Sequence, residues 1–417
     1  MDAVVLALPM DGAGPHDELA GLPLVLRTVL ALQKEGFTRV LLVGGEGVAG
    51  RIRVDRRVRI HIERSSAPDL ARALASAASQ LTAPFLIARH DVVVENGVYR
   101  ALRDAPLGDA LALVVDTQDA RGGPLVATAA FAKAVGASRL EDAVDRLEQD
   151  GSIRSIAVPG GWAVRVTTPE NRKRAVDALF EACRKPVDGL VAKNLNRHIS
   201  IFLSKRLVHT ALTPNMMSAF TFVLGVAAAV LAARGGWANV VLAAFLLQWN
   251  SILDGVDGEL ARVRYQQSRL GQWLDTVSDD VSNVLFYAGL GIGAQALPLG
   301  NVLMLCGVAA AVVQLVTMAL QYSELVRLGS GDLYALEWNF DARPPEGIAG
   351  RLLAFFRQVV KKDFATLFYL TLAVVGVLPY FLPGIAVGQV CVLVATLLRR
   401  RRRPATIQPD QQATAQR

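Results

Sequence analysis

The C-terminal half of this chain is dominated by apolar stretches, which begin after Met216 and continue almost to the end of the sequence. A helix needs about 20 mostly apolar residues to cross the hydrocarbon core of a bilayer. We therefore predict an all-α membrane domain at residues 211–403, followed by a disordered tail at 404–417. The six expected spans lie at about 216 to 233, 237 to 257, 273 to 293, 300 to 322, 364 to 382 and 384 to 399.

The distribution of charge predicts how the chain is oriented. An even number of spans returns both termini to one side, and the basic run from Arg399 to Arg403 marks that side as cytoplasmic by the positive-inside rule. No cleavable leader pattern precedes the first domain. We expect an integral protein of the cell inner membrane with both termini in the cytoplasm. Its basic residues gather beside apolar segments, which indicates contact with membrane lipids and no binding of nucleic acid.

The N-terminal half has a different pattern, in which short β-branched runs alternate with amphipathic helical stretches. This alternation predicts an α/β domain of Rossmann-like type with a mostly parallel sheet at residues 1–184. Residues 185–210 mix apolar and basic side chains and predict an amphipathic linker helix at the membrane surface. The expected buried strands are Ala3 to Leu8, Val40 to Val43, Phe85 to Ala88 and Leu111 to Val115, and the clearest helices are Leu24 to Gly36 and Pro169 to Cys183.

Four aspartates occur within the second and third apolar stretches, where a charged side chain is costly and indicates a functional site. On an α-helix, Asp254 and Asp257 lie about 60° apart, and Asp275 and Asp279 lie about 40° apart on the next helix. Two helices packed through these faces would bring four carboxylates together. Such a group cannot all be buried and charged without cations, so the pattern predicts a divalent metal.

The residues around these aspartates indicate what else the site binds. All-oxygen ligands favour Mg²⁺ or Mn²⁺ over zinc. Gly258 and Ala261 leave room on the same helix for a ligand, and Arg262 adds a planar donor suited to phosphate. All five histidines precede the first span, so a base inside the membrane must be a carboxylate. The residues therefore predict a site for a pyrophosphate and its metals.

The same positions resemble the CDP-alcohol phosphotransferase family, whose pattern D-x2-D-G-x2-A-R-x8-G-x3-D-x3-D the chain matches without a gap. The resemblance covers about residues 187 to 400 and includes Thr213-Pro214-Asn215 before the first span. It implies membrane dimers and two Mg²⁺ or Mn²⁺ ions. The residues that carry the pattern are Asp254, Asp257, Gly258, Ala261, Arg262, Gly271, Asp275 and Asp279.

The resemblance also implies roles for these residues. Asp254, Asp257 and Asp275 hold the metals with help from Asp279, which takes the proton from the acceptor hydroxyl. That hydroxyl attacks the β-phosphorus of a CDP-linked donor and expels CMP. The CDP moiety is expected to contact Asp257, Gly258, Ala261, Arg262, Gly271, Thr213, Pro214 and Asn215.

The N-terminal half resembles the sugar-phosphate nucleotidyltransferases, in the loop Pro9 to Pro15, in Ala88-Arg89-His90-Asp91 and in Thr168-Pro169-Glu170. The residues that hold the triphosphate in that family are missing, and Arg165 and Thr167 stand at the two acidic positions that help to hold Mg²⁺. A guanidinium repels a metal, so we predict a degenerate domain. Asp91 is either a remaining metal ligand or a residue that caps a turn.

The fusion of these two domains resembles the bifunctional enzymes that make CDP-inositol and then di-inositol phosphate. We expect transfer of a substituted phosphate from a CDP-diacylglycerol or CDP-inositol type of donor to a polyol or inositol-phosphate hydroxyl, in phospholipid or phospho-polyol synthesis. Candidate cations for a phosphorylated acceptor are Arg327, Arg343, Lys361 and Lys362, which positive-inside flanking would also explain.

Two alternatives stay open at this stage. In the first, the N-terminal domain is an active cytidylyltransferase that supplies the CDP-alcohol, although the missing cationic residues argue against it. In the second, the chain is a carboxylate-lined cation transporter. Transport does not require the Ala-Arg and Gly spacing, which therefore argues for an enzyme.

Overall fold

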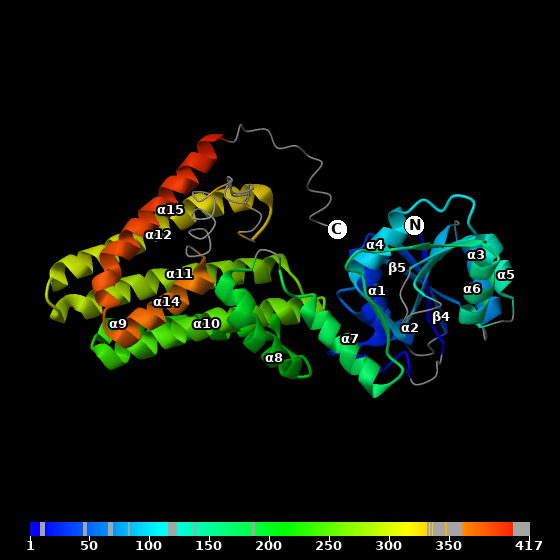
Figure 1. Ribbon diagram of the computed structural model, residues 1–417, viewed down its shortest axis with the longest axis horizontal. Helices are drawn as coiled ribbons and strands as arrows, with labels where there is room; N and C mark the ends of the chain where they lie inside the picture. The colour runs from blue at the N-terminus through cyan, green and yellow to red at the C-terminus, as the bar shows by residue number, and fades with distance from the viewer. Residues whose placement is uncertain are drawn as a thin grey trace. The chain divides into compact units, whose positions relative to one another are not determined.

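The computed structural model describes residues 1–8, 13–44, 48–65, 70–81, 84–115, 123–136, 139–185, 188–331, 333, 336, 347 and 361–402. The described chain divides into two compact units, which are residues 1–182 and residues 183–402 (Figure 1).

The first unit is built on a seven-stranded sheet in the order β10-β8-β9-β6-β1-β4-β5. Every strand runs in the same direction except β9, which is antiparallel to both of its neighbours, β6 and β8. The predicted α/β domain with a mostly parallel sheet is thus confirmed, and β9 is the antiparallel strand of the sheet. The strands are β1 Ala3–Ala7, β4 Arg39–Gly44, β5 His61–Ser65, β6 Phe85–Arg89, β8 Ala112–Val115, β9 Leu125–Ala127 and β10 Ile153–Ile156.

Helices cover both faces of this sheet, as expected for buried strands whose side chains are apolar on both sides. Helices α3 (Leu70–Gln80), α5 (Ala129–Val135) and α6 (Leu140–Gln149) pack on one face and share its main hydrophobic core. Helices α1 (Leu24–Lys34) and α4 (Asn96–Asp104) contact the strands on the other face. The short helix α2 (Val48–Val54) packs next to β5.

Two small antiparallel pairs complete the first unit, β2 (Glu18–Leu19) with β3 (Leu22–Pro23) and β7 (Val92–Val94) with β11 (Ala163–Arg165). The register of the second pair places Arg165 opposite Val92, directly after Asp91. The next helix, α7 (Pro169–Glu181), begins where the Thr168 side chain accepts a hydrogen bond from the Asn171 backbone N–H.

The second unit begins with a linker helix at residues 190–207, which contains the π-helical segment η1 (Ala192–Asn196) and α8 (Arg197–Leu207). Its buried side chains face α10. The long helices that follow are α9 (Pro214–Arg234), α10 (Trp237–Val263), α11 (Arg269–Gly293), α12 (Gly300–Leu328), α14 (Lys362–Val375) and α15 (Leu382–Arg402), with the short turns η2 (Ala294–Ala296) and η5 (Pro379–Phe381).

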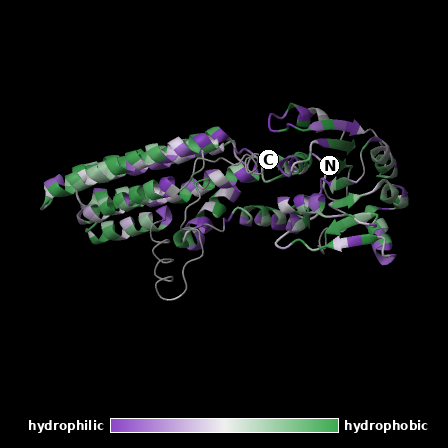
Figure 2. Ribbon diagram, turned by 90° about the horizontal axis from the view of Figure 1, so that it is seen from above, coloured by the Kyte–Doolittle hydropathy of each residue, from purple (hydrophilic) through white to green (hydrophobic). Residues whose placement is uncertain are grey.

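Within the described residues, four helices are long and apolar enough to cross a membrane: Pro214–Arg234, Trp237–Val263, Gly300–Leu328 and Pro379–Arg401. Figure 2 shows how hydrophobic the long helices of this unit are. Six spans were predicted, and the other two correspond to α11 and α14. Helix α11 carries Asp275, Asp279 and Asp280, and α14 has only 14 residues, so neither meets the requirement for a long, nearly uncharged stretch.

Small residues let these helices approach one another closely. A Cβ atom added at Gly225 of α9 would lie 2.1 Å from Ser282 Oγ of α11, and one at Gly307 of α12 would lie 2.7 Å from Gly291 Cα of α11. Close backbone approach through small side chains is how helices associate where no water drives them together. Helix α9 packs extensively against both α10 and α11, and so it holds the two aspartate-bearing helices in one bundle.

Candidate active site

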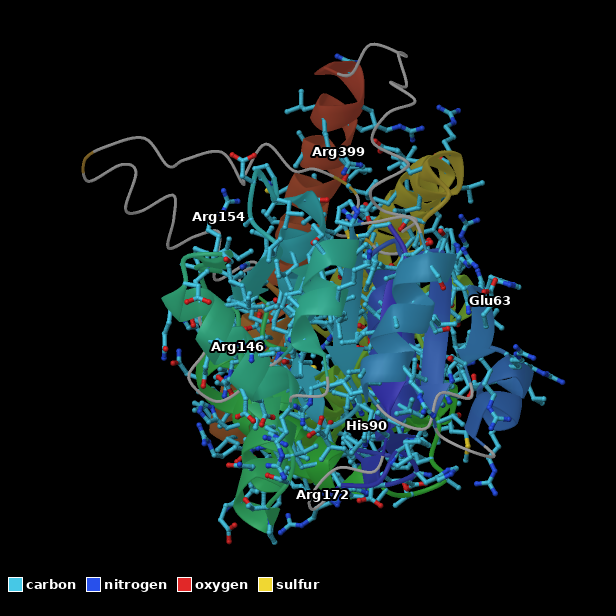
Figure 3. The ribbon with its side chains drawn as sticks, turned by 90° about the vertical axis from the view of Figure 1, so that its right-hand side faces the viewer. Glu63, His90, Arg146, Arg154, Arg172 and Arg399 are labelled. Atoms are coloured by element: carbon cyan, nitrogen blue, oxygen red, sulfur yellow. The ribbon has the colours of Figure 1, made fainter. Side chains whose placement is uncertain are left out.

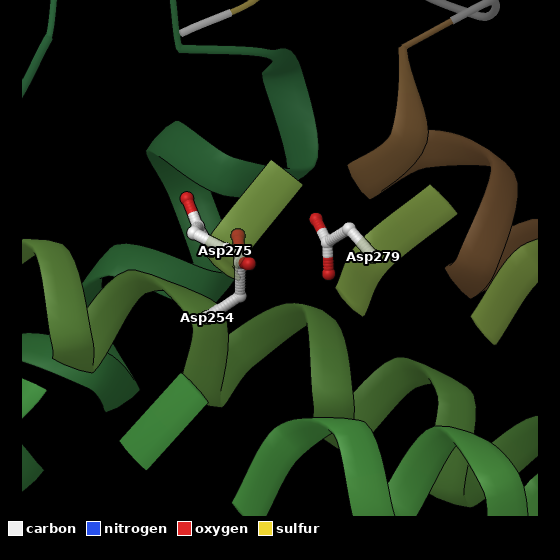
Figure 4. Close-up of side chains that lie close together, drawn as sticks. All are labelled: Asp254, Asp275 and Asp279. Carbon is white, nitrogen blue, oxygen red and sulfur yellow. The ribbon is translucent and has the colours of Figure 1, made fainter. Parts of the chain in front are cut away.

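Three of the four predicted aspartates converge in the second unit. Asp254 of α10 and Asp275 and Asp279 of α11 are half-buried, and each offers a carboxylate oxygen within 4.8 Å of those offered by the other two (Figure 4). Asp275 and Asp279 are four residues apart and therefore share one face of α11. The three carboxylates together can hold a metal ion.

Asp257, the fourth predicted aspartate, has a different environment. Its Oδ2 atom accepts a hydrogen bond of 2.6 Å from Ser218 Oγ of α9, and the residue is buried. Ser218 therefore fixes the orientation of one carboxylate next to the cluster. The sequence analysis did not identify Ser218, because a serine in an apolar span carries no signal by itself.

A lysine from a third helix reaches the cluster. Lys362, at the first position of α14, donates a hydrogen bond to Asp279 Oδ2, and its Nζ atom lies 3.8 Å from Asp254 Oδ1. Three carboxylates and one ammonium leave a formal charge of −2, which one divalent cation would neutralise. The donor set, all carboxylate oxygen, is the type that Mg²⁺ and Mn²⁺ prefer, so these residues fit such an ion.

The structure describes two of the other three candidate acceptor cations. Lys361 is the residue that precedes the first turn of α14, and Arg327 is exposed in the last turn of α12. Arg343 lies outside the described residues. Lys362 is therefore a predicted cation whose contacts with the aspartates are observed.

Several of the predicted CDP contacts lie close to one another. The Arg262 guanidinium lies over Gly258, since a Cβ added there would be 3.1 Å from its Nη1 atom, and Nη2 donates to the Cys183 carbonyl at 3.4 Å. A Cβ at Gly271 would be 3.1 Å from Asn215 Oδ1. Thr213 caps α9 by accepting from the Met216 N–H, and Pro214 takes the first helical position.

The N-terminal region that resembles a metal site is filled by a network of ion pairs. Arg89 donates to both carboxylate oxygens of Asp91, at 2.9 and 2.8 Å, and to Glu141 Oε1 at 2.6 Å. Arg165 donates to Asp91 Oδ2 at 3.1 Å and its Nη1 atom lies 2.8 Å from Glu141 Oε1. Two cations and two anions balance, so Asp91 is neither a free metal ligand nor a simple turn cap.

The electrostatics of Asp91 agree with this role. Burial by itself would raise the pKa of its carboxyl, but the hydrogen bonds and the charge of Arg89 outweigh burial and lower the pKa below its ordinary value. The preceding residue, His90, is labelled in Figure 3. It is fully buried, and its ring nitrogens lie 3.0 Å from the Leu6 carbonyl and 3.2 Å from the Ala13 carbonyl. The motif residues are thus engaged in holding the domain together.

Comparisons with known proteins relate the second unit to a family. The sequence profile described as CDP-alcohol phosphatidyltransferase matches residues 211–336, which include all four aspartates and Arg262. A relative from Aquifex aeolicus, named "Bifunctional IPC transferase and DIPP synthase", is 35% identical over 150 residues, which is 36% of this chain and 34% of the relative. The chain thus spans about a third of the length of that relative.

Two solved structures each resemble about half of this chain. Phosphatidylinositol phosphate synthase from Mycobacterium tuberculosis, crystallised with manganese and citrate, covers 50% of this chain and 92% of its own, with 19% identity and a TM-score of 0.37. UDP-glucose pyrophosphorylase from Acinetobacter baumannii covers 48% of this chain and 99% of its own, with 13% identity and a TM-score of 0.33. The profile match carries the assignment: residues 211–336 of this chain are a CDP-alcohol phosphatidyltransferase domain.

Proposed function

We propose that the membrane half of this chain transfers a substituted phosphate from a CDP-linked donor to the hydroxyl of a polyol or inositol phosphate and releases CMP. The observation that carries this proposal is the convergence of Asp254, Asp275 and Asp279 inside the matched family region. The donor is of the CDP-diacylglycerol or CDP-inositol type. The resemblance of the sequence to bifunctional enzymes that make di-inositol phosphate favours an inositol-containing substrate.

The site is proposed to use two Mg²⁺ or Mn²⁺ ions. Asp254, Asp257 and Asp275 would hold them, with help from Asp279. When bound, such ions neutralise charge on the phosphoryl oxygens and on the leaving group. Ser218 holds the Asp257 carboxylate by its hydrogen bond, and Arg262, which lies over Gly258, is proposed to bind a phosphate of the donor.

The proposed reaction moves one proton to a residue of this chain and replaces one phosphorus–oxygen bond of the donor by another. Asp279 takes the proton from the acceptor hydroxyl, and the oxygen then forms a bond to the β-phosphorus of the donor. The bond from that phosphorus to the CMP oxygen breaks, and CMP leaves with the electron pair. Lys362 donates a hydrogen bond to Asp279, so its ammonium group would lie beside the reacting hydroxyl. A phosphate on the acceptor would form an ion pair with it there.

We further propose that α11 and α14 cross the membrane with the four apolar helices, which gives six spans and two cytoplasmic termini, and that the protein is a homodimer of the inner membrane. A helix with intramembrane carboxylates is stable when they face the bundle and bind cations, as the triad allows. Arg399 in the C-terminal basic run donates to Glu324 Oε2 at 2.5 Å and is buried. The orientation proposal therefore rests on the other basic residues of this run, of which Arg401 is exposed.

The test is CMP release by the purified full chain with Mg²⁺. CDP-diacylglycerol and CDP-inositol are each offered with a panel of acceptors: glycerol, glycerol 3-phosphate, inositol and inositol 1-phosphate. We expect CMP with one donor and a phosphorylated polyol, and a Lys362→Met variant with a higher KM for that acceptor. Absence of CMP with every pair would contradict the proposal.

The alternative, an active N-terminal cytidylyltransferase, is favoured by the word "bifunctional" in the name of the relative. The ion pairs of Asp91 with Arg89 and Arg165 disfavour it, because guanidinium groups stand where that activity needs a metal. Incubation with CTP, Mg²⁺ and inositol 1-phosphate distinguishes the two. We expect no release of pyrophosphate, and release that an Asp91→Asn variant loses would establish the second activity.

A further inference from the structure

Glu259 is a fully buried carboxylate in the middle of the aspartate motif, two residues after Asp257, and the proposed reaction gives it no role. It accepts three hydrogen bonds from the linker helix: from Arg197 Nη1 at 3.0 Å, from Ser200 Oγ at 2.7 Å and from Ser204 Oγ at 2.7 Å. A buried charge is stable only when it is paired and its remaining lone pairs are satisfied. In these contacts, the linker helix supplies both the cation that pairs with Glu259 and the hydroxyl groups that donate to it.

The cation in this cluster is itself held from a second side. Arg197 donates from Nε to Asp188 Oδ2 and from Nη2 to Asp188 Oδ1, both at 2.9 Å. A bidentate pair of this kind fixes the plane of the guanidinium. The row Asp188, Arg197 and Glu259 therefore ties the start of the second unit to α10 through a rigid, charge-assisted connection.

A second connection joins the linker helix to α10 about two turns earlier. Asn196 Nδ2 donates to Ser251 Oγ at 3.4 Å, and Asn196 Oδ1 accepts from Gln248 Nε2 at 3.0 Å. Between the two connections, a Cβ added at Gly255 would lie 3.1 Å from Ser200 Oγ. The absence of a side chain at Gly255 lets the two helices touch there.

These contacts bracket the part of α10 that carries the proposed metal ligands. Asp254 and Asp257 lie between Ser251 and Glu259, and both of these residues are bonded to the linker helix. The carboxylate of Asp254 must meet those of Asp275 and Asp279, which belong to another helix. A rotation or shift of α10 would separate them, and hydrogen bonds within α10 cannot prevent such a rigid movement.

We propose that Glu259 is a positioning residue, which locks α10 to the linker helix so that Asp254 and Asp257 keep the spacing required for metal binding. The proposal rests on the proposed function, because it takes the aspartate cluster as the metal site. The linker helix is then a structural part of the active site as well as a connection at the membrane surface.

The experiment measures binding of Mn²⁺ alone to the full chain in lipid nanodiscs, by electron paramagnetic resonance of the free ion, together with the melting temperature. We expect Glu259→Gln to weaken Mn²⁺ binding about 10-fold, the lower end of the range for residues that orient metal ligands. The matched control is Glu324→Gln, which breaks the buried Arg399–Glu324 pair of the same unit away from the aspartates. It is expected to lower the melting temperature similarly and to leave Mn²⁺ affinity unchanged.

A second variant keeps the test decisive if Glu259→Gln does not fold. The double variant Ser200→Ala with Ser204→Ala retains the ion pair, removes two donors to Glu259, and is expected to weaken Mn²⁺ binding about threefold, a smaller loss because the charge remains paired. Unchanged Mn²⁺ affinity in the folded variants, or an equal loss in Glu324→Gln, would overturn the positioning role. A parent protein that binds no Mn²⁺ would instead overturn the proposed metal site.

Discussion

Removal of the Asp91 carboxylate tests whether this residue stabilises the N-terminal unit through ion pairs with arginines and does not bind a metal ion. In an Asp91→Asn variant, the Arg89 guanidinium, which is 3% exposed, loses a two-point partner and keeps only Glu141. Breaking one partner of a buried pair costs about 3–5 kcal/mol. Because each 1.4 kcal/mol is a factor of ten, opening of the unit should become about 100- to 4,000-fold more frequent.

The assay is hydrogen exchange with mass spectrometry on the full chain, following the amides of β1 and β6. Strands in a core exchange through global opening of their unit, so their protection reports its free energy of unfolding. The control is Asp104→Asn, which breaks the Arg103–Asp104 pair, where the aspartate side chain is 57% exposed. An exposed pair contributes less than about 1 kcal/mol, so this control should change protection by less than about fivefold.

The same carboxylate gives a pH dependence with a defined sign. The pKa of Asp91 is lowered in the folded protein, so its ionisation stabilises the unit fully above the unfolded-state pKa of about 3.9. That contribution is lost as the pH falls through the lower folded-state pKa. Protection of β1 in the parent should therefore decline below about pH 4, and the variant should show a smaller decline. Equal protection in parent and variant, or an Mn²⁺ ion that binds the parent and is lost in Asp91→Asn, would refute the reasoning.

Two further predictions concern the membrane unit. Ser218→Ala removes the hydrogen bond to Asp257 and should weaken Mn²⁺ binding about 10-fold, measured by titration of the free ion; an unchanged affinity would mean that Ser218 does not orient a ligand. Gly225→Leu places a large side chain where even a Cβ would lie 2.1 Å from Ser282 Oγ. Helices α9 and α11 should therefore separate, and the melting temperature should fall by several degrees. An unchanged melting temperature would show that the two helices are not in contact there.

The sequence predicted the parts of the site that depend on helical periodicity. Asp275 and Asp279 share a face because they are four residues apart, and the same periodicity predicted that Asp254 of the preceding helix would face them. The contacts of Ser218 and Glu259 were not predicted, because each depends on which helices pack together. Lys362 was predicted as one of four candidate cations for a phosphorylated acceptor, but its pairing with Asp279, 83 positions earlier in the chain, was not predicted.

The fold, too, was predicted where it depends on sequence periodicity and was not predicted where it depends on how elements pack. Short β-branched runs predicted the buried strands, but the direction of β9 depends on a connection that periodicity does not describe. The six membrane spans were predicted from long apolar stretches, and this criterion does not identify all of them in the structure. Hydropathy identifies four of them in the described chain, whereas α11 falls short because it carries Asp275, Asp279 and Asp280. Arg165 was identified as a departure from a metal site, but its pairing with Glu141 required the fold.

The most direct test of the proposed reaction compares two adjacent aspartates of α11. Asp279 is the proposed base, whereas Asp280 accepts hydrogen bonds from Tyr322 Oη at 2.8 Å and Gln314 Nε2 at 3.2 Å and lies outside the triad. The measurement is the rate of CMP release from the CDP-linked donor at saturating acceptor and Mg²⁺. The proposal predicts a loss of about 10²- to 10⁴-fold in Asp279→Asn and a rate near that of the parent in Asp280→Asn. Release of CMP by Asp279→Asn at the parent rate would contradict it.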